Sequence, residues 1–595
     1  QNLILWDGIK MYQSGHFFGL ISAFNPYLTQ NVTVAKNGTS AMYGDGISSI
    51  VDMQSSNVLS KEFSGGAGFN LINVDAYAKI PLGEKTELQL STRRSLTDLI
   101  ITPTYDQYFK RIFQDTDLTN SQNSDNTVSK NERFYFYDIT TKFLYDISEK
   151  DKLRLNLLNI FNKLNYEEQS TVNDITEALD SKLTQRNTAI SIDYARNWNA
   201  RLTSSAQVYV SNYNLGATNF DILNNQRLIQ ENEVYDNGLK LHFDYKFKPK
   251  LVWKGGYQFS EVGISNLEDV NNPLFRSYIK EVIRTHAVFN ELKYASSSNY
   301  TNIKLGVRAN YIDKFSEFLI EPRLSISQRF LSHFRLEILA ELKSQTTSQI
   351  IDLQNDFLGI EKRRWVLSNN STIPILKSKQ VSTGIHFNKN NLIVGAEIYL
   401  KEVDGITTRS QGFQNQYQFE NKIGAYSVKG LDFLINKQFK TVSAWLSYSY
   451  SENNYTFKDL NSSNIFPNNV DMRHAFTFAG TYTRDRFKFA LGINWRTGKP
   501  YTKPDTNAPI TTDKIIYQSP NSSNLDDYLR TDFSSTYTFK LGNNTDAIAG
   551  FSLWNVLNKS NIINTYYTIN ADDTINKIEN LSLGITPNFS FRLKF

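Results

Sequence analysis

The sequence LILWDGIKMYQSGHFFGLISAFNPYLTQNVTVAKNGTSAMYGDGISSIVDM, residues 3–53, differs in kind from everything that follows it in the chain. Short apolar runs predict three strands, at Leu3–Trp6 and at residues 32–34 and 47–53, with turns at Asp7-Gly8 and Asn37-Gly38. Residues 17–24 and 39–42 predict two short helices. A small α/β unit of roughly 50 residues cannot bury a self-sufficient core.

Two segments of this unit carry a resemblance, WDGIKMYQSGHFFGLISAFNP at residues 6–26 and VTVAKNGTSAMYGDGISSIVDM at residues 32–53. Their order resembles the plug domain of TonB-dependent outer-membrane receptors, in which an Asp-Gly strand, an apical segment, a Val-rich strand and a Tyr-Gly precede the last strand. The wording HFFGLISAFNP is most similar to the subgroup with a carboxypeptidase-regulatory-like domain before the plug. Asp45 departs from that subgroup, which usually has a second glycine there.

Composition narrows the class of protein. The 595 residues have 40% hydrophobic content, a mean hydropathy of −0.42 and 13% aromatic residues. No apolar run approaches the roughly 18 residues that a spanning helix needs, which excludes a helical membrane protein. The absence of cysteine excludes disulfides and thiolate metal sites. A net charge of +5, with no basic run longer than three residues, makes nucleic acid an unexpected partner.

From Lys61 onward the chain alternates with period two. In one example the apolar positions are Ile303, Leu305, Val307, Ala309 and Tyr311, and the positions between them are Lys304, Gly306, Arg308 and Asn310. Such segments predict strands with one apolar and one polar face. Because a soluble sandwich would also alternate, the pattern alone does not choose between a sandwich and a barrel.

Three further features favour a membrane barrel. The predicted strands are about 10 to 18 residues long, whereas strands in globular proteins average about five or six. Their polar faces carry Arg, Lys and Asn, as expected of a wet lumen. Short connections (residues 83–85, 149–151, 297–299, 332–333, 484–486 and 542–544) alternate with long ones (near residues 97–131, 169–180, 217–231, 351–375, 409–423, 457–470 and 503–523). This alternation is the layout of an outer-membrane barrel.

The predicted fold class is therefore all-β, a 22-stranded antiparallel transmembrane β-barrel with a small α/β plug in its lumen. The strand count rests on about 22 alternating segments and ten short turns, and the last strand ends on the aromatic Phe595. We expect residues 1–57 to be the C-terminal part of the plug and residues 58–595 to be the barrel. The family's plug has further strands before the Asp-Gly strand, so we expect that Gln1 is not the true N-terminus.

Candidate ligand contacts lie in residues 11–18, where plugs of this family turn toward the outside. Five side chains there can stack on and hydrogen-bond a ligand: Tyr12, Gln13, His16, Phe17 and Phe18. The alternative is that Phe17 and Phe18 merely pack against the barrel wall. Residues 96–111, in the first long outer loop, have partly helical spacing and either line the mouth or cap the barrel.

Arg93 is the sixth candidate, since residues 93–95 resemble the Arg-Arg-Ser found at this point in the subgroup. Neighbouring strand residues point to opposite sides, so Arg93 is expected to face inward with Glu87, Gln89 and Ser91. It either latches the plug to the barrel or contacts a ligand, or else it is an ordinary solvated residue of the lumen.

No catalytic or metal-binding constellation is visible in the sequence. The six histidines are scattered without metal-ligand spacing, and no Ser/His/Asp set or GxSxG is present. The acidic pairs Asp526-Asp527 and Asp572-Asp573 lie in predicted loops without an apolar pocket. We therefore expect no enzymatic activity, no cofactor and no protein-made metal site, so that any metal would arrive inside a chelate.

The resemblance implies energy-coupled import across the outer membrane of a Gram-negative bacterium. The ligand would be small or medium-sized, bulky and scarce, such as a metal-siderophore chelate, an oligosaccharide or a peptide. Expected partners are outer-membrane lipid and a TonB-type inner-membrane energy complex, reached through an upstream segment missing from this sequence. The alternative is a non-transporting scaffold in a larger outer-membrane assembly with a surface lipoprotein.

Overall fold

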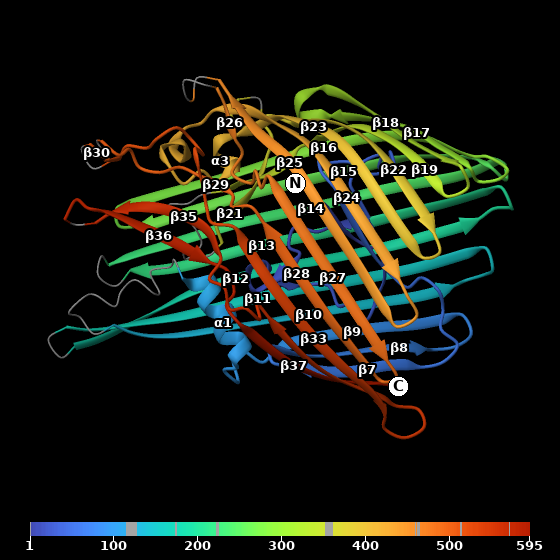
Figure 1. The fold of residues 1–595 in the computed structure, drawn as a ribbon, viewed down its shortest axis with the longest axis horizontal. Coiled ribbons are helices and arrows are strands. Elements are labelled where there is room, and N and C mark those ends of the chain that lie inside the picture. Colours follow the sequence, from blue (N-terminus) through green and yellow to red (C-terminus); the bar gives the residue numbers. More distant parts are fainter. Residues whose placement is uncertain are drawn as a thin grey trace.

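A closed antiparallel barrel forms most of the chain in the computed structural model (Figure 1). The structure describes residues 2–114, 128–172, 175–221, 225–351, 361–369, 371–458, 460, 464–507, 509–511, 514–570 and 572–595. The barrel strands, in chain order, are β7 (Ser64–Asn70), β8 (Asn73–Pro81), β9 (Thr86–Ser95), β10 (Val128–Asp146), β11 (Asp151–Val172), β12 (Ile175–Asn197), β13 (Leu202–Asp221), β14 (Gln226–Lys248), β15 (Leu251–Asn271), β16 (Leu274–Ala295), β17 (Thr301–Ile312), β18 (Glu317–Phe330), β19 (Phe334–Gln345), β22 (Leu376–Lys389), β23 (Leu392–Thr407), β24 (Ile423–Gln438), β25 (Val442–Phe457), β27 (His474–Arg484), β28 (Phe487–Arg496), β33 (Tyr528–Lys540), β34 (Asp546–Trp554) and β37 (Thr586–Lys594).

The predicted 22-stranded fold is confirmed, and the last strand closes on the first. β37 pairs antiparallel with β7 from Ser590↔Asn70 to Lys594↔Gly66, and the three-residue β26 (Ile465–Pro467) adds a short pairing above β27 at the outer end of β25. Closure removes the sheet edges, which lipid requires because it offers backbone groups no hydrogen-bond partner. Among the described residues, no helix has the length and apolar character needed to cross a membrane.

Short turns gather at one end of the barrel and longer connections at the other (Figure 1). Two predicted long loops are wrong. Residues 169–180 and 217–231 mostly continue the hairpins, which remain paired as far as Val172↔Ile175 and Asp221↔Gln226, while residues 173–174 and 222–224 lie outside the described part. β12 and β14 each have 23 residues, more than the roughly 9–11 that cross a membrane, so these hairpins extend beyond it.

Residues 2–55 form a four-stranded sheet in the order β2 (Ile9–Lys10), β1 (Leu3–Trp6), β6 (Ile50–Ser55) and β5 (Thr29–Ala35). The three predicted plug strands are present, although β6 begins at Ile50 and β5 is longer than expected. Both predicted helices are wrong. Residues 17–24 contain the 3₁₀ turn η1 (Phe17–Gly19) and β4 (Ile21–Ser22), and residues 39–42 form only a turn. Phe17 and Phe18 have φ of 51° and 54°, outside the range of a right-handed helix, because contacts with the wall fix this segment.

Side chains of the barrel wall form hydrogen bonds with the plug backbone between residues 37 and 48. Four wall cations donate to plug carbonyl oxygens, namely Lys304 to Gly38, Arg308 to Met42 at 3.3 Å, Arg323 to Tyr43 at 2.7 Å and Lys343 to Ser48 at 2.7 Å. Two wall carboxylates accept from plug amides, Glu341 from Thr39 and Glu291 from Ala41, each at 2.9 Å. The wall thus satisfies backbone groups that this irregular segment cannot satisfy itself.

The closing seam between β7 and β37 depends on a glycine. A Cβ at Gly66 would lie 2.6 Å from the carbonyl oxygen of Leu593 and 2.8 Å from the ring of Tyr77, so we expect Gly66→Val to hinder closure. The measurement is the fraction of chain that shows the heat-dependent gel mobility of a closed barrel, which should fall severalfold. Gly492→Val is the matched control, because a Cβ there has no neighbour within 4 Å. Equal folded fractions for the two variants would contradict the closure argument.

Candidate functional site

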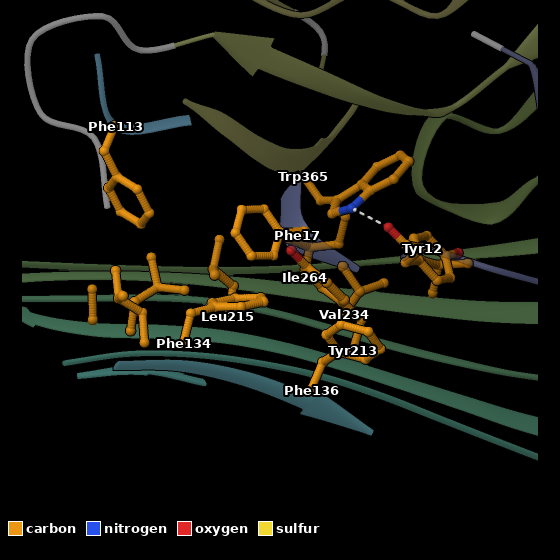
Figure 2. Packing of buried hydrophobic residues seen from close by; sticks show 14 of the residues in the cluster. Tyr12, Phe17, Phe113, Phe134, Phe136, Tyr213, Leu215, Val234, Ile264 and Trp365 are labelled. Atoms are coloured by element: carbon orange, nitrogen blue, oxygen red, sulfur yellow. Dashed lines mark hydrogen bonds between the residues drawn. The ribbon is translucent and has the colours of Figure 1, made fainter. Parts of the chain in front are cut away.

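The apex of the plug is buried between the barrel wall and the outer segments (Figure 2). Tyr12 is 5% exposed, and its hydroxyl donates to Asp236 Oδ2 at 2.9 Å. The backbone amides of Tyr12 and Gln13 both donate to Asn187 Oδ1 at 3.2 Å. Gln13 is also buried. These two predicted ligand contacts therefore lie beneath the surface that a ligand would first meet.

His16 and Arg93 share one wall carboxylate. His16 Nε2 lies 3.1 Å from Asp138 Oδ2, and Arg93 Nε donates to the same oxygen at 2.6 Å. Arg93 Nη2 also donates to the carbonyl oxygen of Ser22 in the plug at 2.6 Å. Arg93 is 8% exposed, so the interpretation as a solvated lumen residue is wrong, whereas the predicted inward orientation is confirmed. The contact with Ser22 joins wall and plug, as the latch interpretation expected.

Burial lowers the pKa of His16, although the hydrogen bond to Asp138 acts to raise it. The nearby Arg93 cation lowers the pKa further, because its positive charge disfavours a second positive charge on the imidazole. The ring stacks on Phe136, with centroids 4.3 Å apart, and its Nδ1 lies 2.7 Å from Asn162 Oδ1. His16 is thus held neutral in a closed polar pocket.

Phe17 packs into an aromatic cluster made by the wall and the first outer segment. It contacts Phe134 of β10 at 4.4 Å between ring centroids, and Tyr105 and Tyr108 of helix α1 (Pro103–Phe113) at 5.8 Å each. The expected helical character of residues 96–111 is therefore confirmed in part, and the helix covers the plug apex. Phe17 is fully buried, as the packing alternative expected, whereas Phe18 is only half-buried.

Trp365 closes the apex from the outer side, and sequence reasoning missed it. It belongs to β21 (Arg363–Leu367), which lies in the outer loop predicted near residues 351–375 and pairs with β20 (Thr347–Ile351) just before that loop. The indole lies edge-on to Tyr12, with centroids 5.0 Å apart, and its Nε1 donates to the carbonyl oxygen of Tyr12 at 3.3 Å (Figure 2). The sequence RRWVL inside a predicted loop did carry a signal, because its Trp and Val favour a strand.

An outer cavity of about 550 Å³ is lined by Phe18 together with residues of the outer connections. Its charged lining residues are the cations Arg111, Lys362, Arg363 and Lys499 and the carboxylate Glu361. Amide side chains line much of the rest: Gln114, Gln411, Gln414, Asn415, Asn469, Asn521, Asn564 and Asn580. Burial lowers the pKa of Lys499 to about 8, and the nearby Arg496 and Arg111 contribute to this shift. The cavity therefore combines dense positive charge with many hydrogen-bonding groups.

Of the six predicted site residues, only Phe18 lines this cavity. Tyr12, Gln13, His16 and Phe17 are packed in the apex below it, and Arg93 contacts the plug from wall strand β9. The described residues contain no cluster of three or more His, Asp or Glu side chains that could hold a metal ion. The arrangement suits reversible binding of an anionic, hydrogen-bonding ligand through cations, amides and the exposed part of Phe18.

Comparisons with known proteins agree with this architecture. The model of the family described as "TonB dependent receptor-like, beta-barrel" matches residues 106–562. Similar solved structures include the outer membrane transporter YddB from Escherichia coli (11% identity, TM-score 0.67) and the FrpB iron transporter from Neisseria meningitidis (F5-1 variant; 13% identity, TM-score 0.67). A mutant of the ferric enterobactin receptor PfeA from Pseudomonas aeruginosa is also similar (12% identity, TM-score 0.65). All three alignments cover 100% of this chain, and they cover 90%, 92% and 90% of YddB, FrpB and PfeA respectively. The search of curated proteins found no match.

We expect Asp138→Ala to destabilise the plug inside the barrel. Removing the carboxylate leaves Arg93 buried without its ion pair, which costs about 3–5 kcal/mol. The measurement is the denaturant concentration at which the plug becomes protease-sensitive in detergent. Asp98→Ala is the matched control, because Asp98 pairs at 2.7 Å with the far more exposed Arg94 and such pairs contribute about 1 kcal/mol or less. Similar losses in both variants would contradict a buried latch.

Acidification should loosen the plug through His16. Its pKa is lowered in the folded protein, whereas unfolded histidine has a pKa of about 6.5. Below that pH the unfolded state binds more protons, so stability falls as the pH drops from about 6.5 toward the folded pKa. The resistance of the plug to protease should therefore decrease as the pH is lowered from about 7.5 to 5. In the His16→Gln variant this decrease should be smaller. A rise in resistance on acidification would be the opposite result.

Proposed function

The chain belongs to the TonB-dependent receptor family of Gram-negative outer membranes, and from this premise we propose that it imports a bulky anionic ligand. Proteins of this family are receptors and transporters. The observation that carries the proposed ligand class is the outer cavity, where four cations and a single carboxylate are the charged groups among the described lining residues.

Anionic chelates of ferric iron are the ligand class that we favour. A chelate that spreads negative charge over a compact, oxygen-rich surface matches cations and amides that approach from several loops. Two similar structures are a ferric enterobactin receptor and the ferric citrate transporter FecA, which supports testing such chelates first. Acidic oligosaccharides and acidic peptides satisfy the same charge requirement and form the comparison set.

A route from the cavity to the plug runs along β21. Arg363 lines the cavity, and Trp365, two residues further on, contacts Tyr12. A ligand that draws Arg363 toward it would move β21 and loosen the edge-on contact that covers the apex. In this proposal Phe18 contacts the ligand directly, while Gln13, His16, Phe17 and Arg93 hold the apex closed until the ligand arrives.

In this proposal residues 1–57 are the plug and residues 58–595 are the barrel, and transport requires that the plug move, because its described part packs against the inward face of the wall. Breaking the buried plug–wall hydrogen bonds together costs several kcal/mol. We propose that a TonB-type inner-membrane complex supplies this work by pulling on a segment upstream of the plug. A scaffold role with a surface lipoprotein remains as an outcome of the test.

The test separates binding from uptake in cells that express the full-length receptor. Ferric citrate and a ferric catecholate chelate, both with radiolabelled iron, should bind at the surface and then enter. Arg363→Gln combined with Lys499→Gln should weaken binding about tenfold or more, because charge-assisted hydrogen bonds contribute about 1.5–3 kcal/mol each. Dissipating the proton gradient should stop entry while leaving binding intact.

The matched control is Lys389→Gln combined with Lys440→Gln, which removes two exposed cations at the periplasmic end of the barrel. This variant should bind and transport like the wild type. Unchanged binding by the cavity variant would place the ligand elsewhere. Uptake that survives loss of the proton gradient would contradict energy-coupled import. If deletion of the upstream segment left uptake intact but abolished a complex with a surface lipoprotein, the scaffold role would be favoured.

A further inference from the structure

The outward face of β9 to β12 shows where this side of the barrel meets the membrane. Near the periplasmic turns, Tyr145 of β10 and Tyr194 of β12 face outward, and Tyr137 and Phe161 form a second aromatic row nearer the outer end. The outward positions between the two rows are largely apolar, and they include Leu90, Phe143, Leu155, Leu157, Ile190 and Ile192. Two aromatic rows that flank an apolar band are the boundaries of the lipid-facing belt.

Five cations face outward at the outer aromatic row or just above it, and we call them the basic rim: Arg94, Arg133, Lys163, Lys182 and Arg186. The strand register places them together. Tyr137 pairs with Arg94 and with Phe161, and Phe161 pairs with Arg186, so these four side chains form one row on one face. Lys163 pairs with Tyr135 in the next row, and Asn165 pairs with both Arg133 and Lys182 in the row above.

The side chains of the basic rim are mostly exposed, and they lie on only four of the barrel strands. Lys163 is half-buried and the other four side chains are exposed. Arg186 lies 5.1 Å above the ring of Phe161, and Arg94 pairs with Asp98 at 2.7 Å. On nearby strand β14, the outward positions in the rows of Arg186 and Lys163 carry the carboxylates Glu233 and Glu231 instead. The five cations of the basic rim thus lie on four adjacent strands, and the next outward positions above them on β11 and β12 are the carboxylates Glu167 and Asp180.

A polar row lies directly below the outer aromatic row, inside the lipid-facing belt. Its outward side chains are Thr92, Ile139, Asn159 and Thr188, of which three are polar, and Asn159 Nδ2 donates to Thr188 Oγ1 at 2.6 Å. Hydroxyl and amide groups facing hydrocarbon are costly unless they find hydrogen-bond partners. Carbonyl groups that link acyl chains to a headgroup would meet this row, while groups above them would meet the basic rim.

We propose that the basic rim binds the phosphates of an outer-leaflet glycolipid that carries more than one phosphate. Adjacent strands are about 4.8 Å apart, so four strands spread the cations over about 14 Å, wider than a single phosphate group. A lipid bound at the basic rim would also contact the aromatic row at the same level and, within the lipid-facing belt, the polar row below it. A soluble acidic protein would reach the cations but would leave these lower rows in lipid.

The experiment uses the full-length chain purified in non-ionic detergent and native mass spectrometry to count retained lipid. The probe is lipid A with both phosphates, compared with the same lipid after enzymatic removal of the phosphates. The unmodified chain should retain the phosphorylated lipid at least tenfold better. Lys163→Gln, Lys182→Gln and Arg186→Gln combined should reduce this retention at least tenfold, since each cation near an anionic surface contributes about a fivefold effect.

The matched control removes three outer cations elsewhere, with Lys280→Gln, Arg284→Gln and Lys429→Gln, of which Arg284 pairs with Glu261 and Lys429 with Glu452. It should retain lipid like the wild type. Equal retention of the dephosphorylated lipid, a control loss as large as that of the rim variant, or displacement by inorganic phosphate at the same phosphate concentration would each overturn the proposal. The comparison of the two lipids on the unmodified chain needs no variant, so it holds even if the triple variant fails to fold.

Discussion

The hydrogen bonds that the barrel wall makes with the plug backbone between residues 37 and 48 are the constraint on which the rest of the structure depends. The described plug sheet has little packing of its own at its edge strand β5, which leaves Val32 58% and Val34 61% exposed. Side chains such as Arg323 and Glu341 supply donors and acceptors where a larger domain would supply its own strands. The lumen wall therefore satisfies plug backbone groups that strand pairing would otherwise satisfy.

Two kinds of contact hold the plug in the barrel, and they differ in what is exposed to water when they break. Bonds between wall side chains and plug carbonyl oxygens can be exchanged for bonds to water, so breaking them exposes little apolar surface. The apex is different, because Phe17 lies in an aromatic cluster and Tyr12 is covered by Trp365. Movement of the apex would therefore require a change in the outer segments that cover it. This order agrees with a plug that stays closed until a ligand reaches the outer cavity.

Most of the barrel could be predicted from the sequence, because alternation and turn residues are local and each strand carries its own signal. The inward orientation of Arg93 followed from the same period. The helices expected at residues 17–24 and 39–42 failed because the wall, distant in sequence, determines their backbone. The outer cavity was not predictable, since its residues come from loops separated by hundreds of positions and local patterns do not encode such contacts. The contact of Trp365 with Tyr12 is likewise non-local, although the strand that carries Trp365 did have a local signal.

The depth of the plug apex in the membrane follows from pairs of consecutive strand residues. Arg93 faces the plug and Arg94 faces outward, Asp138 faces His16 and Tyr137 faces the membrane, and Asn187 binds the plug backbone while Arg186 lies on the basic rim. Because neighbouring residues on a strand point to opposite sides at nearly the same height, the apex lies level with the outer aromatic row. The latch and the basic rim thus share the same strands, so a lipid that steadies β9 to β12 would also steady the wall against which the apex closes.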